Sequence, residues 1–98
     1  MIRHVVMFRW NDDVDAAHVD ATASALDAVA ATVPEVREYR HGSDLGVTEG
    51  NWDYVIVGEF ESFDDYAVYR DHPDHQRVIA EYIKGRVSAR AAVQYDAG

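Results

Sequence analysis

The sequence has no cysteine, which excludes disulfides, thiolate nucleophiles and cysteine-based metal sites. Basic residues are also few: nine stand against 18 acidic residues, and the formal net charge of −9 disfavours binding to nucleic acid or to an anionic membrane surface. No apolar run is long enough to cross a bilayer, and Arg3 and His4 interrupt the short apolar start, so no signal peptide is predicted. These absences predict a cytoplasmic protein with no nucleic-acid or membrane partner.

The chain is short, with 98 residues, and 48% of them are hydrophobic. This length predicts one domain that spans residues 1–98. A domain of this size leaves much of its apolar surface uncovered by its own chain. We therefore expect a homodimer, in which a second copy buries part of that surface.

Three segments show the period-two alternation of a β-strand: Ile2 to Trp10, Trp52 to Phe60 and Val87 to Tyr95. Val36 to His41 alternates more weakly, and Gly42-Ser43-Asp44 is typical of a bend that ends a strand. The first strand is apolar on both faces, which predicts helices on one side and another subunit on the other. Gly58 interrupts one face of the third strand, where it indicates either a ligand gap or a packing defect.

Two helical segments lie between these strands. The first is expected to start at a cap formed by Asp13 or Asp15 and to stop at Pro34; the second is expected to start at Ser62, to break at Pro73 and to end at Gly85. The order β-α-β-β-α-β predicts an α+β, ferredoxin-like fold. The apolar stripe of the first helix is thin in side-chain volume, so this helix either approaches the sheet closely or leaves a pocket beneath it. The stripe comprises Val19, Ala23, Leu26, Ala30 and Val33.

The stretch from Tyr66 to His75 combines two tyrosines and two histidines with a proline. Because Pro73 ends one helix and starts another, His75 falls in the first turn of the helix that begins at Pro73. There the free N–H groups and the helix dipole disfavour a protonated ring. His75 is therefore either a neutral base or a capping or surface residue. His72 and His75 supply only half of a zinc site, so no metal is predicted. His4 is either a buried histidine bonded to backbone or a site residue.

Three motifs carry a resemblance to a known family: Ile2-Arg3-His4-Val5-Val6-Met7-Phe8, Val33-Pro34-Glu35-Val36 and His72-Pro73-Asp74-His75. Together they resemble the Dabb family, the stress-responsive dimeric α/β-barrel domain, over essentially the whole chain. The resemblance implies a homodimer in which two four-stranded sheets face each other as a barrel, with the helices outside. The family includes plant stress proteins, polyketide cyclases that need no cofactor, and many bacterial members with no known activity.

The resemblance also implies site residues. In the cyclases, a tyrosine three residues before His-Pro-x-His and the second histidine of that motif do the chemistry, which implies catalytic roles for Tyr69 and His75. The family's N-terminal strand histidine, close to the same pocket, matches His4. Some members hold magnesium with backbone carbonyls near the turn at Pro34. The predicted substrate-binding residues are His4, Ala23, Leu26, Ile56 and Tyr66, although the cyclases carry aromatic rings on the first helix where this chain has Ala23 and Leu26.

Two functions are compatible with these residues. The first is an enzyme without a cofactor, in which His75 removes a proton next to a carbonyl and Tyr69 donates a hydrogen bond to the enolate. The result is an aldol-type ring closure or a related lyase step on a small aromatic or polyketide-like substrate, with a cofactor-free monooxygenase as the alternative enzyme. The second is a non-catalytic dimer that binds a small apolar ligand or serves in stress protection. In that case Tyr69 and His75 bond to each other or to backbone as core residues, and the pocket is filled by Trp10, Tyr54 and Phe60.

Overall fold

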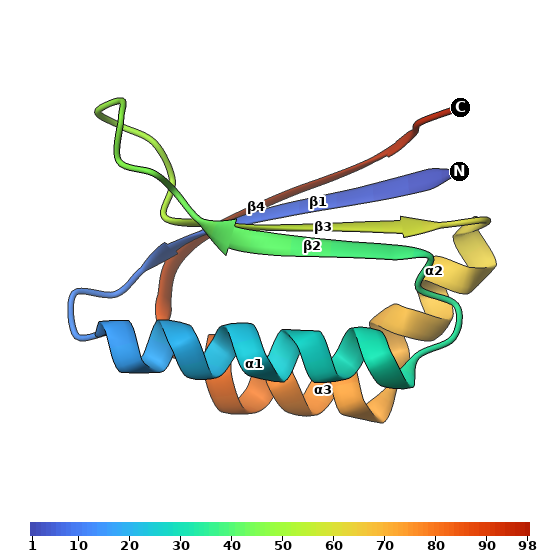
Figure 1. Cartoon of the computed structure of the whole chain (residues 1–98), viewed down its shortest axis with the longest axis horizontal. Coiled ribbons are helices and arrows are strands. Elements are labelled where there is room, and N and C mark those ends of the chain that lie inside the picture. The colour runs from blue at the N-terminus through green and yellow to red at the C-terminus, as the bar shows by residue number, and fades with distance from the viewer.

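The four strands form one antiparallel sheet, with the helices packed on one of its faces (Figure 1). The computed structural model describes residues 1–98. The strands are β1 (Ile2–Trp10), β2 (Glu38–Ser43), β3 (Tyr54–Phe60) and β4 (Val87–Asp96), in the spatial order β2-β3-β1-β4. Helix α1 follows β1, and the second helical segment follows β3, so the predicted α+β, ferredoxin-like βαββαβ fold is confirmed.

Helix α1 (Ala16–Thr32) begins where the Asp15 carboxylate accepts a hydrogen bond from the His18 amide at 2.8 Å, as predicted. Its buried positions differ from the predicted stripe. Ala23 and Ala30 are only half-buried, whereas Thr22 and Val29 join Leu26 and Val33 in the core. The apolar pattern missed Thr22 because threonine is polar. Its hydroxyl donates to the His18 carbonyl at 2.8 Å, and this hydrogen bond allows the side chain to be buried.

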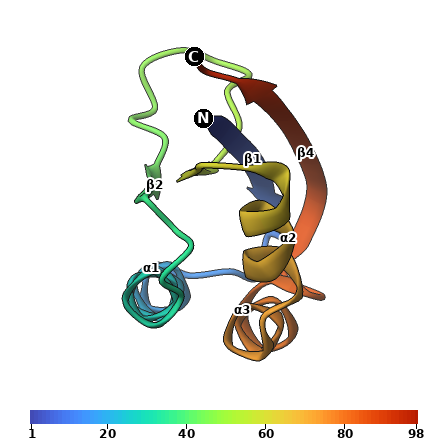
Figure 2. The ribbon, with the colours of Figure 1, turned by 90° about the vertical axis from the view of Figure 1, so that its right-hand side faces the viewer.

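The second helical segment is divided into three pieces. Helix α2 (Phe63–Asp71) begins at the Ser62 cap, and α3 (Pro73–Val78) begins after the break predicted at Pro73. A π-helical turn, η1 (Ile79–Ile83), then closes with a bond from the Lys84 amide to the Ile79 carbonyl at 2.8 Å. Figure 2 shows α1 and α3 side by side beneath the sheet, with α2 closer to it.

The second and third strands differ from the predictions at their ends. β2 begins at Glu38, two residues after the predicted start at Val36. β2 continues through Gly42 and Ser43, which were predicted to form a bend, because both residues pair with β3. Strand pairing overrides their weak local preference for extended structure. Trp52 was predicted to start the third strand but lies outside it, where the Arg9 guanidinium stacks 4.7 Å from the centre of a Trp52 ring.

The two faces of the sheet have different surroundings. The helix-facing residues of β1 and β3 are buried and form the core with α1 and α2. No helix covers the opposite face, where Val5, Met7, Val55 and Val57 are half-buried and Val93 is 54% exposed. The loop between β2 and β3 rises on this open side (Figure 1). No helix of the chain combines the length and the apolar character needed to cross a membrane.

Candidate functional site

A cavity of about 210 Å³ lies between the helix-facing side of the sheet and the helices. Most of its wall is apolar and buried, whereas the three exposed residues of its lining are all polar: Arg70, Gln76 and Arg90. These three therefore form the rim, where the cavity meets solvent. The other lining residues are His4, Val6, Phe8, Leu26, Ile56, Tyr66, Tyr69, His75, Val78, Ile79 and Ile83.

The helix break at Pro73 fixes the tautomer of His75. Because α2 ends at Asp71, the Arg70 carbonyl lacks its usual helical partner, and the His75 Nδ1 lies 3.0 Å from it. A carbonyl only accepts, so Nδ1 carries the proton and donates, which leaves Nε2 with a free lone pair in the neutral ring. Burial lowers the pKa of His75, so the ring is neutral near pH 7. The dominant cause is desolvation, not the free helical N–H groups that the sequence pointed to.

His4 is also a neutral histidine, but its ring proton lies on the opposite nitrogen from that of His75. The Gln94 side-chain amide donates to His4 Nδ1 at 2.8 Å, so the ring proton of neutral His4 lies on Nε2. Burial lowers the pKa of His4 to about 4 and keeps the ring neutral. His4 packs against Tyr66, with ring centroids 5.0 Å apart. His4 therefore accepts from a side chain at Nδ1 and can donate from Nε2, and it is not the backbone-bonded histidine of the alternative interpretation.

Tyr69 connects this cavity to β2. Its ring contacts His75 with centroids 4.1 Å apart, while its hydroxyl lies 2.8 Å from that of Tyr39. Tyr69 is 2% exposed, and burial raises its pKa far above the ordinary value; burial also raises the pKa of Tyr39 to about 12. Both hydroxyls are therefore protonated at neutral pH. Tyr69 and His75 do not bond to each other, and each has a different partner.

The structure brings together most of the predicted site residues. His4, Leu26, Ile56, Tyr66, Tyr69 and His75 all line the cavity. Ala23 does not, because the helix turns Leu26 and not Ala23 toward it. The rings proposed to fill the pocket, those of Trp10, Tyr54 and Phe60, are not part of its wall.

The ring of Phe60 lies elsewhere in the core, in the space left by Gly58. A Cβ at Gly58 would lie 3.1 Å from Phe60 Cε2 and 3.4 Å from Tyr39 Cδ1. Gly58 therefore permits close packing of rings and leaves no ligand gap.

Sequence reasoning missed Tyr39, Gln76, Arg90 and Gln94. Tyr39 is hydrogen-bonded to the catalytic candidate Tyr69, and Gln94 is hydrogen-bonded to His4, a predicted substrate-binding residue. Gln76 donates to the Arg70 carbonyl at 2.6 Å beside His75. Arg90 and Gln94 could have been found from the alternation of the last strand, because every second residue of a strand points to the same face of the sheet. Gln94 pairs with His4, and Arg90 pairs with Phe8, so both share the helix-facing side.

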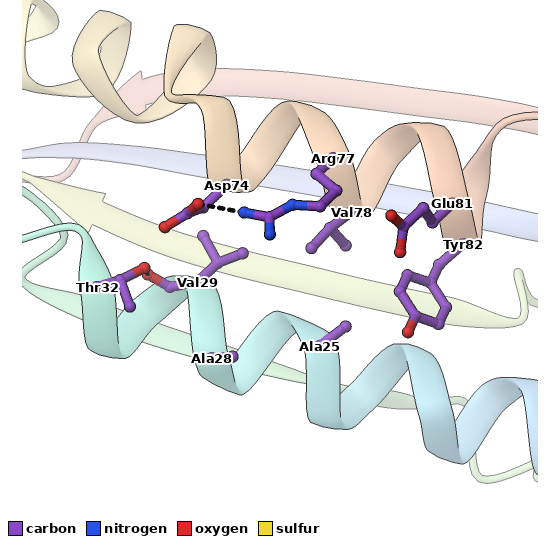
Figure 3. A pocket seen from close by; sticks show the side chains of 9 residues that line it. All are labelled: Ala25, Ala28, Val29, Thr32, Asp74, Arg77, Val78, Glu81 and Tyr82. Carbon is purple, nitrogen blue, oxygen red and sulfur yellow. Dashed lines mark hydrogen bonds and ion pairs between the residues drawn. The ribbon is translucent and has the colours of Figure 1, made fainter.

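A second, wider groove lies between α1 and α3 (Figure 3) and shares only Val78 with this cavity. Its volume is about 380 Å³, and small residues of α1 face the Asp74–Arg77 ion pair, Glu81 and Tyr82 across it. It contains none of the histidines and none of the buried polar groups described above. The smaller cavity is the better candidate because polar groups converge on it from the sheet and from two helices.

No three histidine or acidic side chains lie close enough together to hold a metal ion. The His72 Nδ1 accepts from the Asp74 amide at 3.1 Å and so caps α3. Near Pro34, the Val33 carbonyl accepts a hydrogen bond from the Val36 amide at 3.1 Å, which closes the turn.

We expect the free energy of unfolding to fall as the pH drops from about 6.5 to about 4. The pKa of His4 is about 4 in the folded chain and 6.5 ordinarily, so the unfolded chain binds the proton first. The loss reaches about 2–3 kcal/mol, and the lowered pKa of His75 acts in the same direction. Urea unfolding at pH 7 and pH 4.5 measures it. The His4→Gln variant should show a smaller difference between the two pH values; an unchanged difference would contradict the assignment.

The sequence is similar to one known domain family and to plant proteins that contain this domain. The sequence model of the stress responsive A/B barrel domain matches residues 2–97. A stress-response A/B barrel domain-containing protein of Arabidopsis thaliana is 31% identical over 91 residues, which cover 85% of this chain and 32% of the plant protein. This chain therefore spans about a third of the length of that relative.

Solved structures match over nearly the whole chain. A dimeric ferredoxin-like protein of unknown function from Thermobifida fusca is 39% identical, with a TM-score of 0.90 over 96% of this chain and 88% of that one. The hydroxynitrile lyase of Passiflora edulis is 18% identical, with a TM-score of 0.84 over 96% of this chain and 90% of that one. At that identity the likeness concerns the fold alone.

Proposed function

Since this chain belongs to the stress-responsive A/B barrel domain family, we propose that it is a homodimeric, cofactor-independent cyclase or lyase with His75 as its general base. The observation that supports this most is the state of His75. Its Nδ1 is committed to the Arg70 carbonyl, its ring is neutral, and it lines a cavity with apolar walls. A neutral imidazole with one fixed nitrogen and one free nitrogen is suited to proton abstraction.

The proposed chemistry needs only proton transfers. His75 Nε2 removes a proton from a carbon next to a carbonyl, and the electron pair moves to the carbonyl oxygen as an enolate. The enolate carbon then attacks a second carbonyl of the same substrate, which forms a carbon–carbon bond and an alkoxide. The imidazolium of His75 returns its proton to that alkoxide. The reverse sequence is a lyase reaction, and the Passiflora edulis enzyme shows that this fold hosts a lyase.

In the proposed reaction, two donors stabilise the enolate oxygen. Neutral His4 carries its proton on Nε2, since Gln94 occupies Nδ1. Tyr69 has one proton and can give it to a substrate when Tyr39 donates to the Tyr69 oxygen. Such a chain of two hydroxyls polarises the second and makes it a better donor. In the proposed site, Tyr39 supports Tyr69, and Tyr69 contacts the substrate.

The open face of the sheet supports the proposed homodimer. Its centre is apolar, formed by Val5, Met7, Val55 and Val57, and the Arg3–Glu59 pair lies at one end of it. An apolar centre with charged groups at its edge is the anatomy of a protein interface. The similar Thermobifida fusca protein is dimeric. A second copy placed on this face would complete a barrel with the helices outside.

The general test of this function does not require the natural substrate. Small aryl ketones and β-keto thioesters are incubated with the protein in D₂O, and exchange of their α-protons is followed by NMR. We expect exchange faster than with buffer alone. Tyr69→Phe should raise the barrier by about 2–4 kcal/mol because it removes a transition-state hydrogen bond. Tyr39→Phe should raise it by only about 1 kcal/mol, because it removes the supporting bond.

The alternative function predicts a different pattern for the same two variants. In a non-catalytic binding protein, both hydroxyls serve only the Tyr39–Tyr69 bond. Tyr39→Phe and Tyr69→Phe would then lower the melting temperature by similar amounts. No ketone in the panel would exchange faster than in buffer, and that result would remove the enzymatic proposal.

A further inference from the structure

Arg90 differs from most arginines of this chain in having no partner. Its side chain forms no ion pair and no hydrogen bond within the chain, although acidic residues outnumber basic ones by 18 to nine. Carboxylates pair with Arg3, Arg37, Arg40, Arg70 and Arg77. Among the basic residues without a carboxylate partner, Arg90 is the one that lines the cavity. Its guanidinium is therefore available to a ligand.

The surroundings of Arg90 place its charge at the mouth of the cavity. Arg90 is exposed and pairs with Phe8 in the register of β1 and β4, on the side of the sheet that faces the helices. Its charge acts on three groups of the cavity wall: it favours the neutral forms of His4 and His75 and the ionised form of Tyr69. Ala92, the next residue on this face, is small and exposed, so no bulky side chain stands between Arg90 and Gln94.

The other rim residues do not compete with Arg90 for an anion. Arg70 is held by both oxygens of Asp71, at 2.9 and 3.1 Å, and its charge is neutralised there. Gln76 uses its amide to donate to the Arg70 carbonyl. The two histidines of the cavity are neutral. Arg90 is therefore the only free positive charge at a cavity whose wall is mostly apolar.

We propose that the cavity binds a small ligand with one ring or a similar apolar body and one carboxylate, and that Arg90 holds the carboxylate at the rim. A planar guanidinium matches a carboxylate in a two-point, charge-assisted hydrogen bond. The volume of about 210 Å³ lies below the roughly 300–1,000 Å³ of pockets for drug-sized ligands, which limits the body to about one ring. The inference rests on the proposed function for the location of the site, and it adds the substrate class.

The net charge of −9 repels anions from the protein as a whole, so a preference for a carboxylate must arise locally. Arg90 is the residue that determines it. The carboxylate stays at the rim, which leaves the carbonyl group of a keto acid free to reach His75 and His4 inside.

The test compares two probes of equal shape, benzoate and benzamide, by NMR titration of the full chain at pH 8, where both histidines are neutral. We expect the wild type to bind benzoate at least about tenfold more tightly than benzamide. Arg90→Gln should weaken benzoate binding by about 10- to 100-fold and leave benzamide within about threefold. Arg86→Gln is the matched control, because Arg86 is exposed, unpaired and outside the cavity. It removes the same charge and should leave the preference intact.

Three outcomes would overturn the inference. They are equal binding of the two probes by the wild type, no binding of either probe, and an equal loss of benzoate binding in Arg90→Gln and Arg86→Gln. The last would show that overall charge, and not the rim, sets affinity. The titration involves no turnover, so its result is independent of whether His75 is a base. Proton exchange from neutral ketones without any preference for benzoate would leave the proposed function standing and remove this inference alone.

Discussion

Replacement of His75 by asparagine should lower the rate of α-proton exchange or turnover by about 10²- to 10⁴-fold. Asparagine keeps a side-chain N–H that can donate to the Arg70 carbonyl but lacks the basic Nε2. The carbonyl also accepts from Gln76, so the variant leaves no buried acceptor unsatisfied. Ligand binding and the melting temperature should therefore change little. His75→Ala should be equally inactive, with a loss of stability of less than about 1 kcal/mol.

His72→Asn is the matched control for this experiment. His72 belongs to the same motif, but its Nδ1 caps α3 by accepting from the Asp74 amide, and it does not line the cavity. An asparagine oxygen can accept the same bond. Activity should survive in this variant. Loss of activity in both variants, or in neither, would contradict the role of His75.

The pH dependence of the rate gives an independent check on the same residue. A base is active when it is unprotonated, so kcat/KM should rise with pH and then level off. The rise should be centred on the pKa that His75 has in the folded protein without substrate. Burial lowers that pKa below its ordinary value of 6.5, so the rise should lie on the acidic side of 6.5. A rise centred above pH 7 would assign the essential base to another group.

Local patterns in the sequence were sufficient to predict most of the fold. Alternation predicted β1 with its observed start and end, and Asp15, Ser62 and Pro73 mark helix ends by mechanisms that act within a few residues. The errors occurred at residues whose structure depends on contacts and not on the local sequence pattern. Pairing with β3 extends β2 through Gly42, and a hydrogen bond allows Thr22 into the core. Neither effect is visible in the apolar pattern.

The candidate site was predictable only in part, for a related reason. Tyr69 and His75 are close in sequence, so the motif itself brings them together. The groups that bond to them come from another strand or from the backbone: Tyr39 of β2 bonds to Tyr69, and the Arg70 carbonyl accepts from His75. His4 depends in the same way on Gln94 of β4. Any residue supplies a carbonyl, and the registers of β2 and β4 follow from the whole sheet. The sequence therefore predicts which residues can react, while their protonation states require the fold.

Val55→Asp should dissociate the proposed homodimer at micromolar concentration. Val55 lies near the centre of the open face and pairs with Met7 on β1 and Gly42 on β2. In a two-fold interface the new carboxylate is buried twice, and each unpaired buried charge costs several kcal/mol. In the separated chains the same carboxylate is exposed to water, so the monomer should remain folded. Sedimentation velocity measures the mass, and far-ultraviolet circular dichroism confirms the fold.

Ala21→Asp serves as the control for added charge, because Ala21 is exposed on α1, on the opposite side of the sheet. It should leave the mass of a dimer unchanged. A wild type that is monomeric at micromolar concentration, or a Val55→Asp variant that stays dimeric, would contradict the barrel arrangement. The cavity lies on the helix-facing side of the sheet, so its wall comes from one chain. A folded Val55→Asp monomer should therefore still bind benzoate, which would separate the role of the interface from that of the site.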